Sequence, residues 1–229
     1  MVGVSVRREK PLIGIDVDDT LLDMKDPLIA TLAEKFGIYI NPWDFATPDL
    51  KKTTGLSEEE IGDLVHYTYS RSDFAELQAL PGSQDAIAAL GEEYDFVAVT
   101  SRPEESRNLD IHEITLTNLK LRFPGNLERV LHSRTWDGNG DSKSKIEIAI
   151  EEGAVAIIDD FVHYLIHPRN KEVVKILVTQ EWNYALPIEN DHALFGGMFR
   201  MNHWSHYRNV FQRAGLEIDG NGYRDNGGK

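Results

Sequence analysis

The sequence predicts an α/β fold built on a doubly wound, Rossmann-like parallel sheet. Four short apolar runs rich in β-branched residues carry this prediction, because runs with little alternation are typical of strands buried on both faces. Segments with helical periodicity lie between these runs, and strands that alternate with helices favour a parallel sheet. The predicted strands are residues 12–16, 96–100, 154–158 and 173–178, and the predicted helices include 27–36, 84–91, 111–121 and 145–152.

Composition narrows the class of protein. The chain has 229 residues, of which 41% are hydrophobic and 27% charged, as in a globular protein with one large domain or a core that carries a small insertion. The formal net charge of −14 argues against binding to nucleic acid polymers or anionic lipid. It leaves room for a small phosphorylated substrate in a locally positive, metal-containing pocket. Because the sequence has no cysteine, disulfides, thiolate metal sites and a cysteine nucleophile are excluded.

The first residues carry no recognisable targeting or membrane signal. Basic residues in the first ten positions are not followed by an apolar segment, and no stretch approaches the ~18 uncharged residues of a membrane span. We therefore expect a cytoplasmic protein with no membrane partner. A phage or organelle protein addressed by a segment outside this sequence is the alternative. Residues 1–10 and 217–229 are expected to be loose tails.

Residues 38–79 are predicted to form a small helical cap inserted after the first strand–helix unit, so that residues 1–37 and 80–229 form the core. An amphipathic helix is expected at residues 57–69, because Ser57 and Glu60 have capping-box spacing. Several aromatic residues of this segment are candidates to stack on a substrate or close a lid, or else to form the cap's own core. They are Trp43, Phe45, Tyr67, Tyr69 and Phe74.

The motif Asp16-Val17-Asp18-Asp19-Thr20 directly follows the first predicted strand. Alternate positions at a strand end place Asp16 and Asp18 in one crevice as the backbone leaves the sheet. Two such carboxylates can divide the work of phosphoryl transfer, since one attacks phosphorus and the other protonates the leaving oxygen and then deprotonates water. A divalent cation would offset their repulsion. A cation-binding loop or an acidic helix cap is the alternative.

Polar residues end two other predicted strands. Thr100 and Ser101 follow the second strand, where hydroxyl and backbone N–H groups suit a transferring phosphoryl group, although such residues also start turns. Asp159 and Asp160 follow the third strand, and adjacent carboxylates there are expected to bind a hard cation, most naturally Mg²⁺. Helix capping is the alternative. Because ligands of parallel sheets bind at the carboxyl ends of the strands, we expect these groups to meet.

Lys145 is predicted to open a helix, because Ser144 and Glu147 have capping-box spacing. Its ammonium group would then add to the positive end of the helix dipole, where an anion is favoured. Lys143, two residues earlier, is the rival. Residues 137–148 resemble an EF-hand loop but lack its glycine and its glutamate, so they are expected to form a turn.

In this order, the motifs resemble those of the haloacid dehalogenase (HAD) superfamily: Asp-x-Asp-x-Thr, Thr/Ser, Lys and Asp-Asp, over residues 11–161. Lys145 precedes Asp159 by fourteen positions, a familiar separation in that superfamily, which favours it over its rival. The resemblance implies a Rossmann-like core with an inserted cap and an aspartyl-phosphate intermediate on Asp16. It also implies that Lys145 steadies the nucleophile and the phosphate, and that Thr100 donates to a phosphoryl oxygen.

The same resemblance implies a magnesium site. The ion would be held by Asp16, the main-chain carbonyl of Asp18, and the pair Asp159 and Asp160. Which member of that pair ligates the ion directly is left open by the sequence.

Within the superfamily the chain is most similar to the 5′(3′)-deoxyribonucleotidase group. The small cap, the return at residues 80–82, Arg102 after Thr-Ser, the segment 181–183 and a late Trp204 carry this similarity. It implies Mg²⁺-dependent hydrolysis of nucleoside monophosphates. The candidate phosphate- or substrate-binding residues are Ser101, Arg102, Trp43, Phe45 and Phe74. Phe161 departs from the group, some members of which carry arginine there, and this puts nucleotide specificity in question.

The motif pattern is also compatible with other functions. A HAD phosphatase of another small phosphorylated metabolite, a phosphotransferase and a degenerate binding protein all share parts of the pattern, and a homodimer is left open. A receiver domain fits less well, because its lysine comes last, whereas Lys145 precedes Asp159 and Asp160. A 2-haloacid dehalogenase would have no need of Asp18 as a proton shuttle.

Overall fold

The computed structural model describes residues 10–42, 49–133, 143–169, 171–188, 195 and 197–216. Among these residues, a six-stranded sheet has the order β5-β2-β1-β6-β7-β8, and its neighbouring strands all pair in parallel. The strands are β1 (Leu12–Ile15), β2 (Asp95–Thr100), β5 (Val130–His132), β6 (Ala156–Asp159), β7 (Val174–Val178) and β8 (Met198–Met201). The predicted α/β class with a parallel sheet is confirmed.

The helices match the periodic segments of the sequence closely. Those around the sheet are α4 (Ser83–Leu90), α5 (Ile111–Arg122), α6 (Lys145–Glu151), α7 (Val162–Leu165) and α9 (Tyr207–Arg213), with short turns η3 (Phe74–Glu76) and η4 (Trp204–His206). A small antiparallel ribbon joins β3 (Glu105–Ser106) to β4 (Leu109–Asp110). Within the described part of the chain, no helix is long and apolar enough to cross a membrane.

The sequence analysis missed the two edge strands, β5 and β8. Strand β5 has only three residues and ends in His132, which is partly exposed. Strand β8 contains Arg200 and is fully buried only at its two ends. Edge strands are covered on fewer sides, so they lack the continuous apolar run that marks the central strands.

The order of the strands determines where a ligand can bind. From β1 the chain builds one half of the sheet through β2 and β5, and then returns to β6 and builds the other half through β7 and β8. The direction of winding therefore reverses between β1 and β6. In doubly wound sheets the crevice at the carboxyl ends of the strands at this switch point is the usual ligand site.

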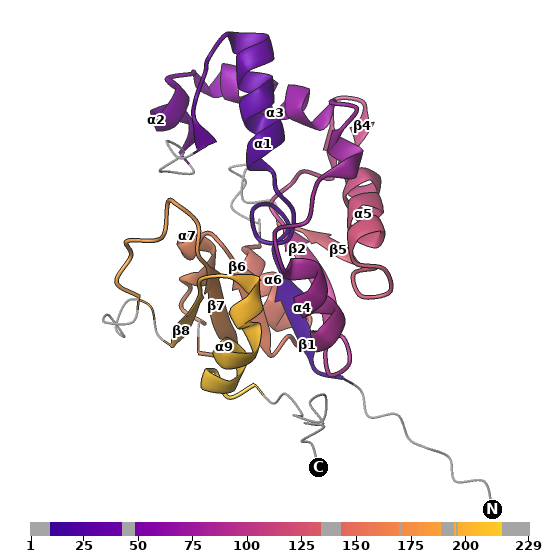
Figure 1. The fold of residues 1–229 in the computed structure, drawn as a ribbon, viewed down its shortest axis with the longest axis vertical. Helices are drawn as coiled ribbons and strands as arrows, with labels where there is room; N and C mark the ends of the chain where they lie inside the picture. Colours follow the sequence, from indigo (N-terminus) through magenta and orange to yellow (C-terminus); the bar gives the residue numbers. More distant parts are fainter. Residues whose placement is uncertain are drawn as a thin grey trace, which may run out of the picture.

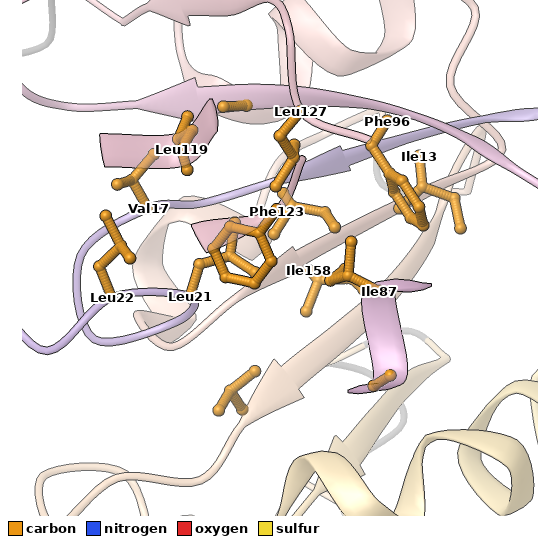
Figure 2. Close-up of a cluster of buried hydrophobic side chains, with 14 of the residues drawn as sticks. Ile13, Val17, Leu21, Leu22, Ile87, Phe96, Leu119, Phe123, Leu127 and Ile158 are labelled. Carbon is orange, nitrogen blue, oxygen red and sulfur yellow. The ribbon is translucent and has the colours of Figure 1, made fainter. Parts of the chain in front are cut away.

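Apolar side chains cover both faces of the sheet. On one face, Ile13 and Ile158 of the central strands pack with Ile87 of α4 and with Phe123 after α5, as Figure 2 shows. On the other face, α6 and α7 pack over a second cluster that includes Ile157. Gly14 allows α6 to approach, because a Cβ atom at this position would lie 3.3 Å from the Cβ of Ala149. This close approach brings the beginning of α6 to the end of β1.

A separate group of helices follows β1: α1 (Lys25–Thr31), which continues into the π-helical turn η1 (Leu32–Phe36), α2 (Leu50–Thr54) and α3 (Glu58–Tyr69). They lie together beyond the carboxyl ends of the strands (Figure 1). Their hydrophobic cluster centres on four buried leucines and includes no residue of the sheet: Leu28, Leu32, Leu56 and Leu64. Helix α1, which the sequence analysis assigned to the core, thus packs with the inserted helices, and the domain boundary at residue 38 stays a prediction.

Candidate active site

Asp16 lies at the switch point, immediately after β1. Its backbone N–H donates to the carbonyl of Ile158 at 2.9 Å, which extends the pairing of β1 with β6 by one residue. The side chain is buried at the carboxyl edge of the sheet. The chain then turns sharply through Asp19, which has a left-handed backbone with φ of 54°, a conformation that aspartate tolerates better than most residues.

Lys145 projects into the same place from the beginning of α6. The capping box of Ser144 and Glu147 is present and fixes the first turn of this helix. The Lys145 Nζ atom lies 2.6 Å from Oδ1 of Asp16 and 2.9 Å from Oδ2 of Asp159, and its side chain is 2% exposed. Lys143, by contrast, is 59% exposed and pairs with Glu151. The structure therefore brings Lys145, and not its rival, to Asp16.

Asp16, Asp159 and Asp160 form a buried acidic cluster, in which one oxygen of each lies within 4.8 Å of the others. Burial raises the pKa of Asp16, which nearby Lys145 partly offsets. Burial also raises the pKa of Asp159 to about 7, again against the effect of Lys145. The pKa of Asp160 is raised well above its ordinary value by burial and by the charges of the other two carboxylates. Burial opposes the charge of Lys145, but Asp159 and Asp16 outweigh it and raise the lysine pKa.

This cluster fits a divalent cation. Three carboxylates face one ammonium group, which leaves a formal charge of −2 in a buried place when all of them are ionised. Hard cations such as Mg²⁺ prefer carboxylate and carbonyl oxygens. Both oxygens of Asp159 are already engaged, one by Lys145 and the other by the N–H of Phe161 at 2.8 Å. Asp160, whose Oδ1 accepts from Thr20 at 3.1 Å, also lines the adjoining cavity.

Two residues outside the predicted site, Asn183 and Trp204, hold the loops around this cluster. The amide of Asn183 donates to the carbonyls of Asp160 and Val178, both at 2.7 Å, which ties the end of β6 to the end of β7. The indole N–H of Trp204 donates to the carbonyl of Thr20 at 2.8 Å. Asn183 and Trp204 stand out in the sequence only as parts of a family resemblance, because hydrogen bonds to distant carbonyls leave no local pattern.

Asp18 is not a member of the acidic cluster and has an ion-pair partner of its own. The guanidinium group of Arg102 contacts both oxygens of Asp18, with Nε at 3.1 and 3.0 Å and Nη2 at 2.5 Å from Oδ1. Arg102 is almost fully buried and does not line the cavity beside Asp16. Its expected contact with phosphate is therefore not what the structure shows, because the side chain is turned inward onto Asp18.

The remaining predicted residues divide into three groups. Ser101 lines the cavity, and its hydroxyl lies 3.2 Å from that of Ser133. Thr100 is buried, and its Oγ1 accepts from the N–H of Arg102 at 3.1 Å. The ring of Phe74 is fully buried against Arg102 and does not line the cavity, so its contact with substrate stays a prediction. Trp43 and Phe45 lie outside the described residues.

A cavity of about 580 Å³ opens between this site and the inserted helices. Its polar lining includes the predicted site residues Asp16, Asp18, Lys145, Asp160 and Ser101, and further polar lining residues are Asp19, Asp49, Lys52, His163 and Asn183. Its apolar part comes from α1, α2 and α3, from α7 and from the loop after β7. The apolar and aromatic lining residues are Met24, Leu28, Leu50, Val65, Tyr69, Phe161, Val162, Tyr164, Trp182 and Leu186.

Comparisons with known proteins agree with this architecture at the level of the fold. No protein-family model matches the sequence. The curated proteins likewise give no match. Solved structures do match. A structure described as "a predicted phosphatase" from Clostridium acetobutylicum has a TM-score of 0.62 at 15% identity, covering 90% of this chain and 100% of that one.

Two further structures support the same fold. A haloacid dehalogenase-like hydrolase from Streptococcus pneumoniae has a TM-score of 0.53 at 16% identity, covering 74% of this chain and 85% of its own. A protein from Bacillus subtilis described as a HAD-hydrolase bound to magnesium has a TM-score of 0.53 at 12% identity, covering 92% of this chain and 100% of its own. Such similarity does not favour the 5′(3′)-deoxyribonucleotidase group over other HAD-like proteins. The chain has the Rossmann-like α/β fold of HAD-like hydrolases.

Proposed function

We propose that this protein is a Mg²⁺-dependent phosphomonoester hydrolase that acts through an aspartyl-phosphate on Asp16. One observation carries the proposal: Asp16, Lys145, Asp159 and Asp160 meet at the switch point of the sheet, beside a cavity that also exposes Asp18. Packing does not require three buried carboxylates on one lysine, whereas phosphoryl transfer requires both a nucleophile and a cation.

The proposed metal ligands follow from which carboxylates line the cavity. Asp16 and Asp160 line the cavity and would hold the ion, together with the main-chain carbonyl of Asp18. Asp159 would act indirectly, since its oxygens hold Lys145 and the Phe161 N–H. A bound Mg²⁺ would neutralise charge that develops on the phosphoryl oxygens.

In the first half of the proposed reaction, a carboxylate oxygen of Asp16 attacks phosphorus and forms a P–O bond. The bond between phosphorus and the leaving oxygen breaks, and that oxygen receives a proton from the Asp18 carboxyl group. Lys145 holds Asp16 in place from 2.6 Å and adds positive charge at the phosphoryl site. Ser101, which lines the cavity, is a candidate donor to a phosphoryl oxygen.

In the second half, the Asp18 carboxylate takes a proton from a water molecule. The water oxygen attacks phosphorus, the bond to Asp16 breaks, and inorganic phosphate leaves. Asp16 is then a carboxylate again and Asp18 is protonated, so the cycle closes. Without this base, the aspartyl-phosphate should persist, because general base catalysis contributes roughly 10²- to 10⁴-fold.

For the leaving group we propose a nucleoside, so that the substrate is a nucleoside monophosphate. Phe161, Tyr164 and Trp182 give one wall of the cavity flat aromatic surfaces, and the inserted helices would cover it as a cap. The indole N–H of Trp182 is buried without a hydrogen-bond partner among the described residues, so a substrate acceptor could satisfy it. Another small phosphorylated metabolite is the alternative substrate, and transfer to an acceptor other than water is the alternative reaction.

A phosphatase screen tests the function and the substrate separately. Nucleoside monophosphates, sugar phosphates and phospholipid-like head groups are incubated with the protein and Mg²⁺, and released phosphate is measured. We expect Mg²⁺-dependent release that is fastest from nucleoside monophosphates. Equal rates on all classes would contradict the nucleotide proposal alone. No release from any class, with EDTA and Mg²⁺ giving the same result, would contradict hydrolysis.

A further inference from the structure

The contacts of Arg102 indicate a role that the reaction needs and no motif assigns. We propose that Arg102 is a positioning residue that fixes Oδ1 of Asp18 and leaves Oδ2 as the oxygen that transfers the proton. The inference rests on the proposed function, in which Asp18 protonates the leaving oxygen and deprotonates water.

The two oxygens of Asp18 are held unequally. Oδ1 accepts from Nε of Arg102 at 3.1 Å and from Nη2 at 2.5 Å, while Oδ2 has only the shared Nε contact at 3.0 Å. Charge-assisted bonds to a guanidinium fork fix the direction of a carboxylate as well as its place. The side chain of Asp18 is still 28% exposed and lines the cavity beside Asp16. Oδ2 is therefore the oxygen better able to carry a proton to a ligand.

Both the side chain and the backbone of Arg102 are held by contacts with other residues. Its Nη1 donates to Oγ1 of Thr115 in α5 at 2.9 Å, and its guanidinium lies 4.8 Å from the ring centre of Phe74. Its N–H donates to Thr100, and its carbonyl accepts from Nδ1 of His132 at 2.8 Å. The fork is thus pre-organised before any ligand binds. A general acid must reach the leaving oxygen at hydrogen-bond distance in a narrow range of directions, which a fixed carboxylate provides.

Two other roles for Arg102 fit these contacts less well. Phosphate binding would need a free nitrogen in the cavity, but all three guanidinium nitrogens are engaged by Asp18 and Thr115. A purely structural role would not require a charge, because replacing a buried ion pair with apolar groups of similar volume is often neutral or stabilising.

The test is a double-mutant cycle on the first chemical step. Single-turnover release of the phenol is measured with phenyl phosphate and with 2,4-dinitrophenyl phosphate, two esters of similar shape. The dinitrophenolate leaving group needs no proton. The rate of its release therefore does not depend on proton transfer from Asp18, but it does depend on the other groups of the site. We expect Arg102→Met to slow release from phenyl phosphate by about 10²-fold and from the dinitrophenyl ester by less than about 10-fold.

The cycle is completed with Asp18→Asn. If Arg102 acts through Asp18, the double variant Arg102→Met/Asp18→Asn releases phenol from phenyl phosphate no more slowly than Asp18→Asn alone. If the rate losses of the two single variants multiply in the double variant, the positioning role is overturned. It is also overturned if Arg102→Met slows release from the two esters equally. Wild-type protein that releases neither phenol in the presence of Mg²⁺ would instead contradict the proposed hydrolysis.

Two milder variants keep the test decisive if Arg102→Met does not fold. Thr115→Val removes one anchor of the guanidinium and keeps the ion pair, and we expect a loss of several-fold on phenyl phosphate only. Arg102→Lys keeps the charge without the fork, and its loss on the same ester should exceed that of Thr115→Val. Losses that are the same on both esters in these variants would also overturn the proposal.

Discussion

The carboxylates at the end of β1 and β6 are compensated in two different ways. Asp16, Asp159 and Asp160 share a single lysine and keep an excess of negative charge. Asp18, two residues after Asp16, has an arginine of its own. This difference in charge compensation separates the proposed roles of the two groups. The cluster of three aspartates, which keeps an excess of negative charge, suits a cation and a nucleophile. The ion pair of Asp18 and Arg102, whose geometry is fixed, suits proton transfer.

Removing the nucleophile should have the largest effect on activity. Asp16→Asn keeps the shape of the side chain, and we expect turnover to fall roughly 10⁴-fold or more, as when other catalytic nucleophiles are removed. The variant also relieves repulsion in the cluster, so the metal-free protein should not lose stability. Released phosphate and thermal unfolding measure the two quantities. Activity near that of the wild type would contradict the role of Asp16.

Removing the lysine should have the largest effect on stability. Lys145→Met removes the ammonium group that contacts the buried carboxylates of Asp16 and Asp159, and we expect a loss of about 3–5 kcal/mol in the free energy of unfolding. Lys143→Met is the matched control. That lysine is exposed and pairs with Glu151, so its replacement should change the free energy of unfolding by no more than about 0.5 kcal/mol. Denaturant unfolding of both variants without metal measures the difference. Equal losses would show that the cluster does not depend on Lys145.

These expectations show how much of the site the sequence could give. Asp16, Lys145, Asp159 and Asp160 follow central elements with strong patterns, so their meeting point is predictable from the topology of a parallel sheet. The partner of Arg102 is not, because Asp18 lies eighty-four positions away and a buried ion pair leaves no local signal. Phe74 illustrates the same limit, since a ring in a loop-rich segment can pack inward or face a ligand.

The buried carboxyl groups of the site should make the stability of the protein depend on pH. Burial raises the pKa of Asp159 to about 7 and that of Asp19, which lies beside the cluster, to about 8, while unfolded aspartates titrate near 3.9. Groups whose pKa is raised in the folded state stabilise the fold while they are protonated, so stability falls as the pH rises from the unfolded pKa toward about 7 to 8 and levels off above the folded pKa.

In the metal-free protein, we expect the free energy of unfolding to fall by about 1.4 kcal/mol per pH unit for each proton that the folded state retains. This corresponds to roughly 5–10 °C in Tm between pH 6.5 and 8. Saturating Mg²⁺ should reduce the slope, because the cation offsets the charge that the protons otherwise neutralise. Asp160→Asn should lower both the slope and the effect of Mg²⁺. A Tm that rises with pH over this range without metal would contradict the description of the cluster.

The apolar wall should give the smallest effect. Trp182→Ala removes one aromatic surface of the cavity, and we expect KM for a nucleoside monophosphate to rise about 10-fold, which is about 1.4 kcal/mol. A small alkyl phosphate should be affected less. Tyr184→Ala, two residues along the same loop but 75% exposed and away from the cavity, is the control and should leave KM unchanged. Equal shifts for both substrates would argue against a base on this wall.

The most direct test of the account is to trap the covalent intermediate. Asp18→Asn protein is mixed with Mg²⁺ and the substrate that the wild type hydrolyses fastest, quenched in acid and analysed by peptide mass spectrometry. We expect one phosphoryl group on the peptide that contains Asp16, located on Asp16 itself. We expect no phosphoryl group in the Asp16→Asn/Asp18→Asn double variant. A phosphoryl group on another residue, or none on a protein whose wild type turns over, would contradict the account.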